Sequence, residues 1–262
     1  MSLLDDILAS RRAELSALGP RGRTGSPRTP IDAIRALRRR PGEPLRLIAE
    51  VKRRSPSAGA LSRVLSPAER ALAYAEAGAA MVSVLCDSAY FDGSWEHLAA
   101  ARVALDREGC AVPLLAKDFV VSDRQIFEAR DRGADAVLLI ARIVDRGELA
   151  RLARVAREEG IEPLVEVVDE AELDAAIAAE ARLVGVNARD LDTLAMDSAR
   201  TARVCAAIPS SVVAVHLSGL REATDVARIA HGRPDAALVG EALMRDDDPR
   251  PRLRAMIDAA RG

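Results

Sequence analysis

The chain has 262 residues, of which 49% are hydrophobic and only 2% are aromatic. Its 38 basic and 40 acidic residues leave a formal net charge of −2, which offers no bulk attraction to nucleic acid or to an anionic membrane. No stretch approaches the roughly 20 apolar residues of a membrane span, and the N-terminal apolar run contains two aspartates, unlike a signal peptide. We therefore expect a cytoplasmic protein without nucleic-acid or membrane partners.

The cysteines and histidines give no sign of a metal site. The three cysteines are widely spaced and form no Cys-x-x-Cys pair, a pattern typical of free thiols in a reducing compartment. The three histidines are equally scattered, whereas metal ligands recur at short, fixed spacings. We therefore predict that the protein binds no metal.

Residues 1–45 precede the first predicted strand and form a helical extension. They read as a helix over Leu3–Ser16, a loop rich in Gly, Pro and Arg over Gly19–Pro30, and a second helix over Ile31–Arg40. We expect this extension to cap or flank the domain that follows.

From residue 46 onward a pattern recurs about every fifty residues. In each copy a helix end is followed by a glycine or polar break and then an apolar strand: Glu76–Leu85, Asp131–Ile140, Ala179–Val186 and Gly232–Gly240. Four further strand candidates lie between them: Leu47–Lys52, Val112–Ala116, Glu162–Val167 and Val212–Leu217. Amphipathic helical runs follow the strands, such as Ser94–Arg107, Asp123–Arg132, Arg146–Glu159 and Glu222–Ala230.

Eight short strands that alternate with helices predict a parallel sheet, and eight strands close a barrel. An open, doubly wound sheet is the alternative, but the segment after the first strand contains no GxGxxG nucleotide loop. We predict one α/β domain, a (β/α)8 TIM barrel over residues 46–262 with the N-terminal helical extension over residues 1–45.

Charged or hydrogen-bonding residues follow six of the eight predicted strands, at the end where such barrels carry their active sites. The candidate site residues at these strand ends, with the apolar Phe119 beside Lys117, are Glu50, Lys52, Ser55, Lys117, Phe119, Glu166, Asn187, Arg189, Ser218, Gly219, Gly240 and Glu241. Each alone could be a solvated rim charge or a turn residue, but their coincidence at one mouth favours a catalytic site. Glycine loops after the last two strands offer backbone N–H groups where barrels commonly hold phosphate. The set predicts acid–base chemistry on a phosphorylated small molecule.

Several of these residues lie in motifs that resemble indole-3-glycerol-phosphate synthase, the ring-closing enzyme of tryptophan biosynthesis. The matching segments are Ala49–Ser57, Lys117–Phe119, Val165–Val167, Gly185–Leu191 and Val239–Met244. The similarity covers nearly the whole chain. It implies a carboxy-lyase that converts 1-(2-carboxyphenylamino)-1-deoxyribulose 5-phosphate into indole-3-glycerol phosphate, CO2 and water.

The resemblance also implies roles for individual residues. Lys117 would protonate the ribulose carbonyl as the aromatic carbon attacks, and Lys52 would pair with the substrate carboxylate. Glu50 and Glu166 would share the acid–base steps of the dehydration. No cofactor is expected, because the iminium formed on ring closure is itself an electron sink.

The remaining site residues are expected to bind and orient the substrate. The resemblance implies that Asn187 and Arg189 orient the sugar hydroxyls and the carboxylates. The phosphate would be held by Ser55, Ser218, Gly219, Gly240 and the backbone of Glu241, with Phe119 as a further substrate contact.

One position departs from the family pattern. The strand before Ser218 usually ends in Glu, and here it ends in Leu217. Loss of that carboxylate is expected to lower the pKa of a nearby lysine, because an opposite charge favours the ammonium form. His216, beside it, is expected to face the helices.

Leu217 keeps alternatives open: a divergent paralogue with a modified substrate, a barrel that binds a phosphosugar or a partner protein without turnover, or a Schiff-base aldolase using Lys117. The oligomeric state stays open too.

Overall fold

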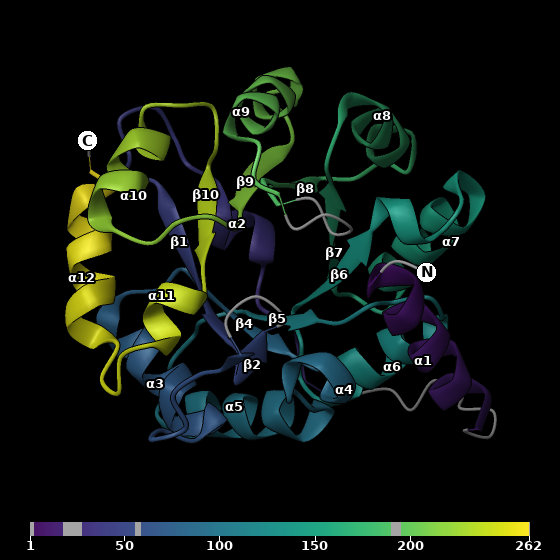
Figure 1. Ribbon diagram of the computed structural model, residues 1–262, viewed down its shortest axis with the longest axis horizontal. Helices are drawn as coiled ribbons and strands as arrows, with labels where there is room; N and C mark the ends of the chain where they lie inside the picture. Colours follow the sequence, from purple (N-terminus) through teal and green to yellow (C-terminus); the bar gives the residue numbers. More distant parts are fainter. Residues whose placement is uncertain (1–2, 18–27, 56–58, 190–194, 262) are drawn as a thin grey trace.

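The computed structural model describes residues 3–17, 28–55, 59–189 and 195–261. Eight parallel strands close into a barrel, as predicted (Figure 1). In chain order they are β1 (Arg46–Val51), β4 (Met81–Leu85), β5 (Leu114–Lys117), β6 (Ala136–Ile140), β7 (Glu162–Val167), β8 (Leu183–Asn187), β9 (Val213–Leu217) and β10 (Ala236–Val239). Each strand pairs with its sequence neighbours, and β1 pairs with both β4 and β10, which closes the ring. A short antiparallel ribbon of β2 (Arg54–Ser55) and β3 (Gly59–Ala60) follows β1.

Helices surround the barrel (Figure 1). They are α1 (Leu3–Ala17), α2 (Ala33–Leu37), α3 (Pro67–Ala77), α4 (Ser88–Phe91), α5 (Trp95–Arg107), α6 (Asp123–Asp131), α7 (Arg146–Glu158), α8 (Glu170–Ala178), α9 (Ser198–Ala207), α10 (Ala223–Ala230), α11 (Glu241–Met244) and α12 (Arg250–Ala259), with a 3-10 turn at Ala141–Ile143. Side-chain caps fix several starts: Ser66, Ser94 and Asp145 each accept a hydrogen bond from the N–H three residues later. Within the described ranges, every helix is too short or too polar to cross a lipid bilayer.

Two predicted elements differ in extent. The strand predicted over Val112–Ala116 begins only at Leu114, because Pro113 has no N–H to donate to a neighbouring strand. The helix predicted over Ile31–Arg40 shrinks to α2, because the backbone of Arg38 turns extended and the Arg39 N–H binds Asp235 Oδ1 at 3.2 Å. The loop predicted over Gly19–Pro30 lies mostly outside the described residues.

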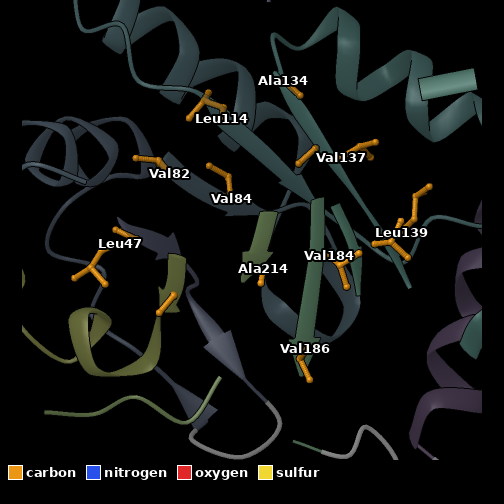
Figure 2. Close-up of a cluster of buried hydrophobic side chains, with 14 of the residues drawn as sticks. Leu47, Val82, Val84, Leu114, Ala134, Val137, Leu139, Val184, Val186 and Ala214 are labelled. Carbon is orange, nitrogen blue, oxygen red and sulfur yellow. The ribbon is translucent and has the colours of Figure 1, made fainter. Parts of the chain in front are cut away.

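The core forms two layers, because successive strand side chains alternate between the barrel interior and the helices. The outer layer includes Leu47, Val82, Val84, Leu139 and Val186, which pack toward the helices (Figure 2). The inner layer fills the barrel with the alternating residues, among them Ile48, Met81, Leu115, Leu164 and Leu238. Aliphatic side chains therefore supply nearly all of the core, as the low aromatic content requires.

Two aspartates at equivalent positions of the sequence repeat close the amino-terminal end of the barrel. Asp135 Oδ2 accepts a hydrogen bond from Leu114 N at 2.8 Å, and Asp235 Oδ2 accepts one from Ala214 N at 2.8 Å. The second oxygen of each binds the extension, through Ile31 N at 2.7 Å and Arg39 N at 3.2 Å. The segment carrying α2 is thereby fixed across this end, which leaves the opposite mouth for the site.

Candidate active site

All of the site residues predicted from the sequence line one cavity at the carboxyl ends of the barrel strands. The predicted strands converge there because all eight run in parallel around one axis. Further residues, which were not predicted as site residues, complete the wall: Leu3, Leu4, Ile7, Leu85, Phe91, Asp118, Leu138, Ile140, Leu220, Arg221 and Leu238. Most of these residues are apolar. The cavity therefore has an apolar wall beside a charged floor, which is formed by Glu50, Lys52 and Lys117.

Glu50 is the centre of the charged floor. Its carboxylate is almost fully buried and contacts both lysines: Oε1 lies 2.9 Å from Lys52 Nζ, and Oε2 lies 3.6 Å from Lys117 Nζ. Glu50 and Lys52 are two residues apart at the end of β1, so their side chains leave the same face. Lys117 ends β5, on the far side of β4.

These contacts oppose the effect of burial on both partners. Burial alone would raise the pKa of Glu50, but the ammonium groups of Lys52 and Lys117 outweigh it and hold that pKa below its ordinary value. Burial alone would lower the pKa of Lys117, but Glu50 and Glu166 outweigh it and raise that pKa. The effect expected from Leu217 stays a prediction, because it compares this chain with one that carries Glu at position 217. Glu50 and Glu166 supply the negative charge that holds the pKa of Lys117 above its ordinary value.

The two lysines of this floor are the only lysines in the chain; the other 36 of its 38 basic residues are arginines. An arginine side chain keeps its proton at any pH that a protein survives, whereas an ammonium group can give one up. Lysine is thus retained only where two ammonium groups meet one buried carboxylate. The scarcity of lysine is visible in the sequence, and a count of residue types would have pointed to these two positions.

A series of side-chain hydrogen bonds connects the ends of three strands on the opposite side of the cavity. Asn187 Nδ2 donates to Glu166 Oε1 at 2.9 Å, while Asn187 Oδ1 accepts from Ser218 Oγ at 2.7 Å and from Arg189 N at 3.0 Å. The two bonds to Oδ1 fix the orientation of the amide, so its NH2 group points at Glu166. Asn187 therefore holds the Glu166 carboxylate in place.

The loops after β9 and β10 form the corner predicted to hold phosphate. Ser218 and Gly219 both have left-handed backbone conformations, with φ of 67° and 87°. A Cβ on Gly240 would lie 2.5 Å from Glu50 Oε1, so only glycine leaves room for the buried carboxylate. The Glu241 side chain turns away to Arg245, at 2.8 Å, and this hydrogen bond lowers the Glu241 pKa.

Helix α1 contributes a wall that sequence reasoning missed. Leu3, Leu4 and Ile7 line the cavity, and the buried Arg11 anchors the helix by binding Asp87 Oδ2 at 2.8 Å and Asp118 Oδ1 at 2.7 Å. The two contacts span sequence separations of 76 and 107 residues, so no local sequence pattern predicts them. Asp118 follows Lys117 directly, and α1 is thereby tied to the strand end that carries the lysine.

Leu217 lines the cavity and is 2% exposed. A Cβ on Gly185 would come within 2.5 Å of Leu217 Cδ1, so the leucine fills the space above that glycine. His216 is buried but does not line the cavity, and burial lowers its pKa to about 4. This placement agrees with the expected orientation toward the helices.

The closed parallel barrel, with a buried carboxylate between two ammonium groups at its carboxyl-terminal mouth, defines an enzyme of the (β/α)8 class. The family model described as indole-3-glycerol phosphate synthase matches residues 4–256. A protein of that name from Nocardioides sp. strain JS614 is 44% identical over 98% of each chain, and one from Mycobacterium ulcerans is 40% identical over 98% of this chain and 94% of its own. The chain belongs to the indole-3-glycerol phosphate synthase family.

Solved structures of lower identity share the fold alone. Thiamine phosphate pyrophosphorylase from Pyrococcus furiosus superimposes with a TM-score of 0.63 at 15% identity, over 84% of this chain and 98% of that one. The 3-hexulose-6-phosphate synthase from Salmonella typhimurium gives 0.59 at 16% identity, over 82% and 98%.

Replacing Arg11 with Ala is expected to lower the free energy of unfolding by about 3 kcal/mol, because it leaves two buried carboxylates without their cation. It should also raise KM more than it lowers kcat, since α1 supplies a wall and no acid–base group. Chemical denaturation and steady-state kinetics measure both effects. Arg12→Ala, on the exposed face of α1, is the control; equal behaviour of the two variants would contradict the anchoring role.

The pH dependence of the ion pair follows from the two pKa shifts. The raised pKa of Lys117 means that its contribution to stability is present below the ordinary lysine value of 10.5 and is lost as the pH rises through the higher folded value. The lowered pKa of Glu50 means that its contribution is present above the ordinary value of 4.5 and is lost on acidification.

Two lysines give two side-chain signals after labelling with lysine carrying 13C at the ε carbon, so NMR can follow Lys117 directly. We expect its midpoint above pH 10.5, and Lys117→Arg assigns the signal. A midpoint below that value would show that the carboxylates do not outweigh burial.

Proposed function

We propose that the chain closes the indole ring: it converts 1-(2-carboxyphenylamino)-1-deoxyribulose 5-phosphate into indole-3-glycerol phosphate, CO2 and water. The observation that carries the proposal is the pair of lysines held on one buried glutamate, in a chain that otherwise uses arginine. The family relationship across nearly the whole chain supports the same reaction.

The phosphate of the substrate is placed at the loops after β9 and β10. Consecutive backbone N–H groups in turns such as Ser218–Gly219 form concave anion sites. The Ser218 hydroxyl is already engaged with Asn187, so the backbone of this turn is the proposed ligand. Gly240, the Glu241 backbone and Ser55 border the same cavity, and Glu241 directs its own charge toward Arg245.

The aromatic ring is placed against the apolar wall. Phe91 and Phe119, whose ring centroids lie 6.1 Å apart, border this wall together with leucines of α1 and the barrel interior. Lys52 lies at the edge of the charged floor, where its ammonium group pairs with the carboxylate of the substrate. This pairing draws Lys52 partly away from Glu50 and leaves Lys117 as the nearer cation to Glu50.

Ring closure is assigned to Lys117. As the ring carbon that bears the carboxylate attacks the ribulose carbonyl carbon, the carbonyl oxygen gains negative charge and takes the proton of the Lys117 ammonium group. The raised pKa of Lys117 keeps this proton in place at neutral pH until substrate arrives. CO2 then leaves from the same ring carbon, and its electron pair neutralises the iminium without a cofactor or a metal.

The dehydration is assigned to the two glutamates. Glu50, kept ionised by its lysines, accepts a proton from the CH2 carbon of the new five-membered ring, and loss of this proton with the hydroxyl group makes the indole aromatic. Glu166, aligned by Asn187, takes up a proton from solvent and passes it to the leaving hydroxyl group, which departs as water. The reaction consumes this proton because the substrate carboxylate leaves as neutral CO2. Arg189 lies at the same mouth and is placed against the sugar hydroxyls.

The competing functions receive less support. A barrel that only binds would not need two lysines and two glutamates converging on one cavity. A Schiff-base lysine needs a lowered pKa so that its amine is free to attack, and the pKa of Lys117 is raised. A cytoplasmic location and action without nucleic-acid or membrane partners remain predictions from the sequence.

Replacing Lys117 with Ala is expected to lower kcat at least 10²-fold, in line with the loss of a general acid. Indole fluorescence after mixing with 1-(2-carboxyphenylamino)-1-deoxyribulose 5-phosphate measures the rate. Lys117→Arg keeps the positive charge but cannot release its proton, so it should lose a similar factor in kcat with less effect on KM. Near-normal turnover in either variant would remove Lys117 from the proton transfer.

Replacing Leu217 with Glu is expected to leave kcat unchanged or lower, because Glu50 and Glu166 already balance Lys117 and the leucine fills an apolar site above Gly185. The same fluorescence assay applies, with Leu217→Gln as a control of similar shape but no charge. A higher kcat in the Glu variant alone would show that the missing carboxylate limits the enzyme.

A further inference from the structure

Beneath the Glu50–Lys117 ion pair lies a serine that the proposed mechanism does not use. Ser83 is on β4, the strand between β1 and β5, and its side chain is fully buried. The register pairs Ser83 with Glu50 on one side and with Leu115 on the other. Because Met81 belongs to the inner layer and side chains alternate, Ser83 also faces the barrel interior.

Ser83 is a polar interruption in an apolar column. The residues before and after it on the same face of β4 are Met81 and Leu85, and Leu85 pairs with Lys117. The hydroxyl group therefore lies one step below the level of the lysine, beside the glutamate. A hydroxyl group at this depth costs free energy unless it makes a hydrogen bond.

Ser83 Oγ and Glu50 Oε2 are both buried atoms without a hydrogen-bond partner among the described residues. Glu50 Oε2 faces Lys117 Nζ at 3.6 Å, which is an ion pair but too long for a good hydrogen bond. Among the side-chain oxygens of the described residues, Ser83 Oγ and Glu50 Oε2 are the only two that are buried and without a hydrogen-bond partner. They come from neighbouring strands at the same register.

We propose that Ser83 and Glu50 Oε2 hold one buried water molecule beneath the Glu50–Lys117 ion pair, and that Ser83 thereby positions Glu50 as a carboxylate. The water donates one hydrogen to Glu50 Oε2 and exchanges a second hydrogen bond with the Ser83 hydroxyl, which satisfies both oxygens. Buried waters of this kind bind where several polar atoms converge.

The bridge matters most when Lys117 has given its proton away. At that moment Glu50 loses one of its two positive neighbours, and Lys52 is drawn to the substrate. A hydrogen bond from below then keeps the carboxylate ionised and ready to accept the ring proton. This role rests on the proposed function, whereas the water site itself does not.

Other titratable and charged groups surround Glu50 and enter any pH profile. They are Lys52 at the end of β1, Lys117 on β5, Glu166 on β7, Arg189 after β8, Glu241 on α11 and Tyr74, whose hydroxyl donates to the Glu50 backbone oxygen at 3.2 Å from α3. Lys117 and Tyr74 do not titrate in acid, because the pKa of each is raised above its ordinary value. Glu166 and Glu241 are unchanged by a substitution at Ser83, so a shift between wild type and variant reports Glu50.

The test compares Ser83→Ala with wild type by kcat at saturating substrate, which removes the titration of the substrate phosphate from the profile. The acid limb of kcat is expected to move up by about one pH unit, the size of a lost hydrogen bond to a carboxylate. The alkaline side should change less than about twofold, and KM should stay constant, since Ser83 lies below the ion pair. Cys86→Ala is the control, because Cys86 is buried, directly follows the same strand and faces the outer layer.

A crystal structure of the wild-type protein tests the water independently of turnover. Density for a water within about 3.2 Å of both Ser83 Oγ and Glu50 Oε2, absent in Ser83→Ala, supports the proposal. A direct Ser83–Glu50 hydrogen bond, empty density, or a variant that loses kcat equally at every pH would overturn it. Inactive wild-type protein with the water in place would refute the proposed function and leave the site standing.

Discussion

The active end of the barrel depends on one buried carboxylate held between two ammonium groups. Burying Glu50 alone would be costly, and Lys52 and Lys117 offset that cost only because their strand ends bring them to 2.9 and 3.6 Å from its oxygens. Two features of the sequence follow from this arrangement. Gly240 must lack a side chain because the carboxylate occupies its space, and lysine replaces arginine only at these two positions.

The N-terminal extension serves both ends of the barrel. The segment around α2 is fixed across the amino-terminal end by Asp135 and Asp235, while α1 borders the active cavity and is anchored by Arg11. One end is thus closed by hydrogen bonds to the strand starts, and the other keeps a cavity whose apolar wall is partly supplied by a helix outside the barrel. The same mouth can therefore receive both an aromatic ring and a phosphorylated sugar.

The barrel and most of the polar site could be predicted from the sequence because both obey local rules. Strand periodicity and the fifty-residue repeat place eight strands, and parallel strands bring Glu50, Lys117 and Glu166 to one mouth. The rest depends on contacts that leave no local pattern. Arg11 pairs with carboxylates far along the chain. The pKa of Lys117 is lowered by burial but raised more by Glu50 and Glu166, which lie on two other strands, and the sequence alone does not show the sum of these effects. The short β5 and α2 show how one proline or one long-range hydrogen bond can trim a periodic pattern.

In the proposed mechanism, Lys117 faces the reacting carbonyl while the phosphate is bound at the β9 and β10 loops. A crystal structure with the substrate whose ketone has been reduced to an alcohol tests it most directly. We expect Lys117 Nζ within about 3.2 Å of the new hydroxyl oxygen, Lys52 on the carboxylate and the phosphate against Ser218–Gly219 and Gly240. A phosphate bound elsewhere, or Lys117 more than about 5 Å from that oxygen, would contradict it.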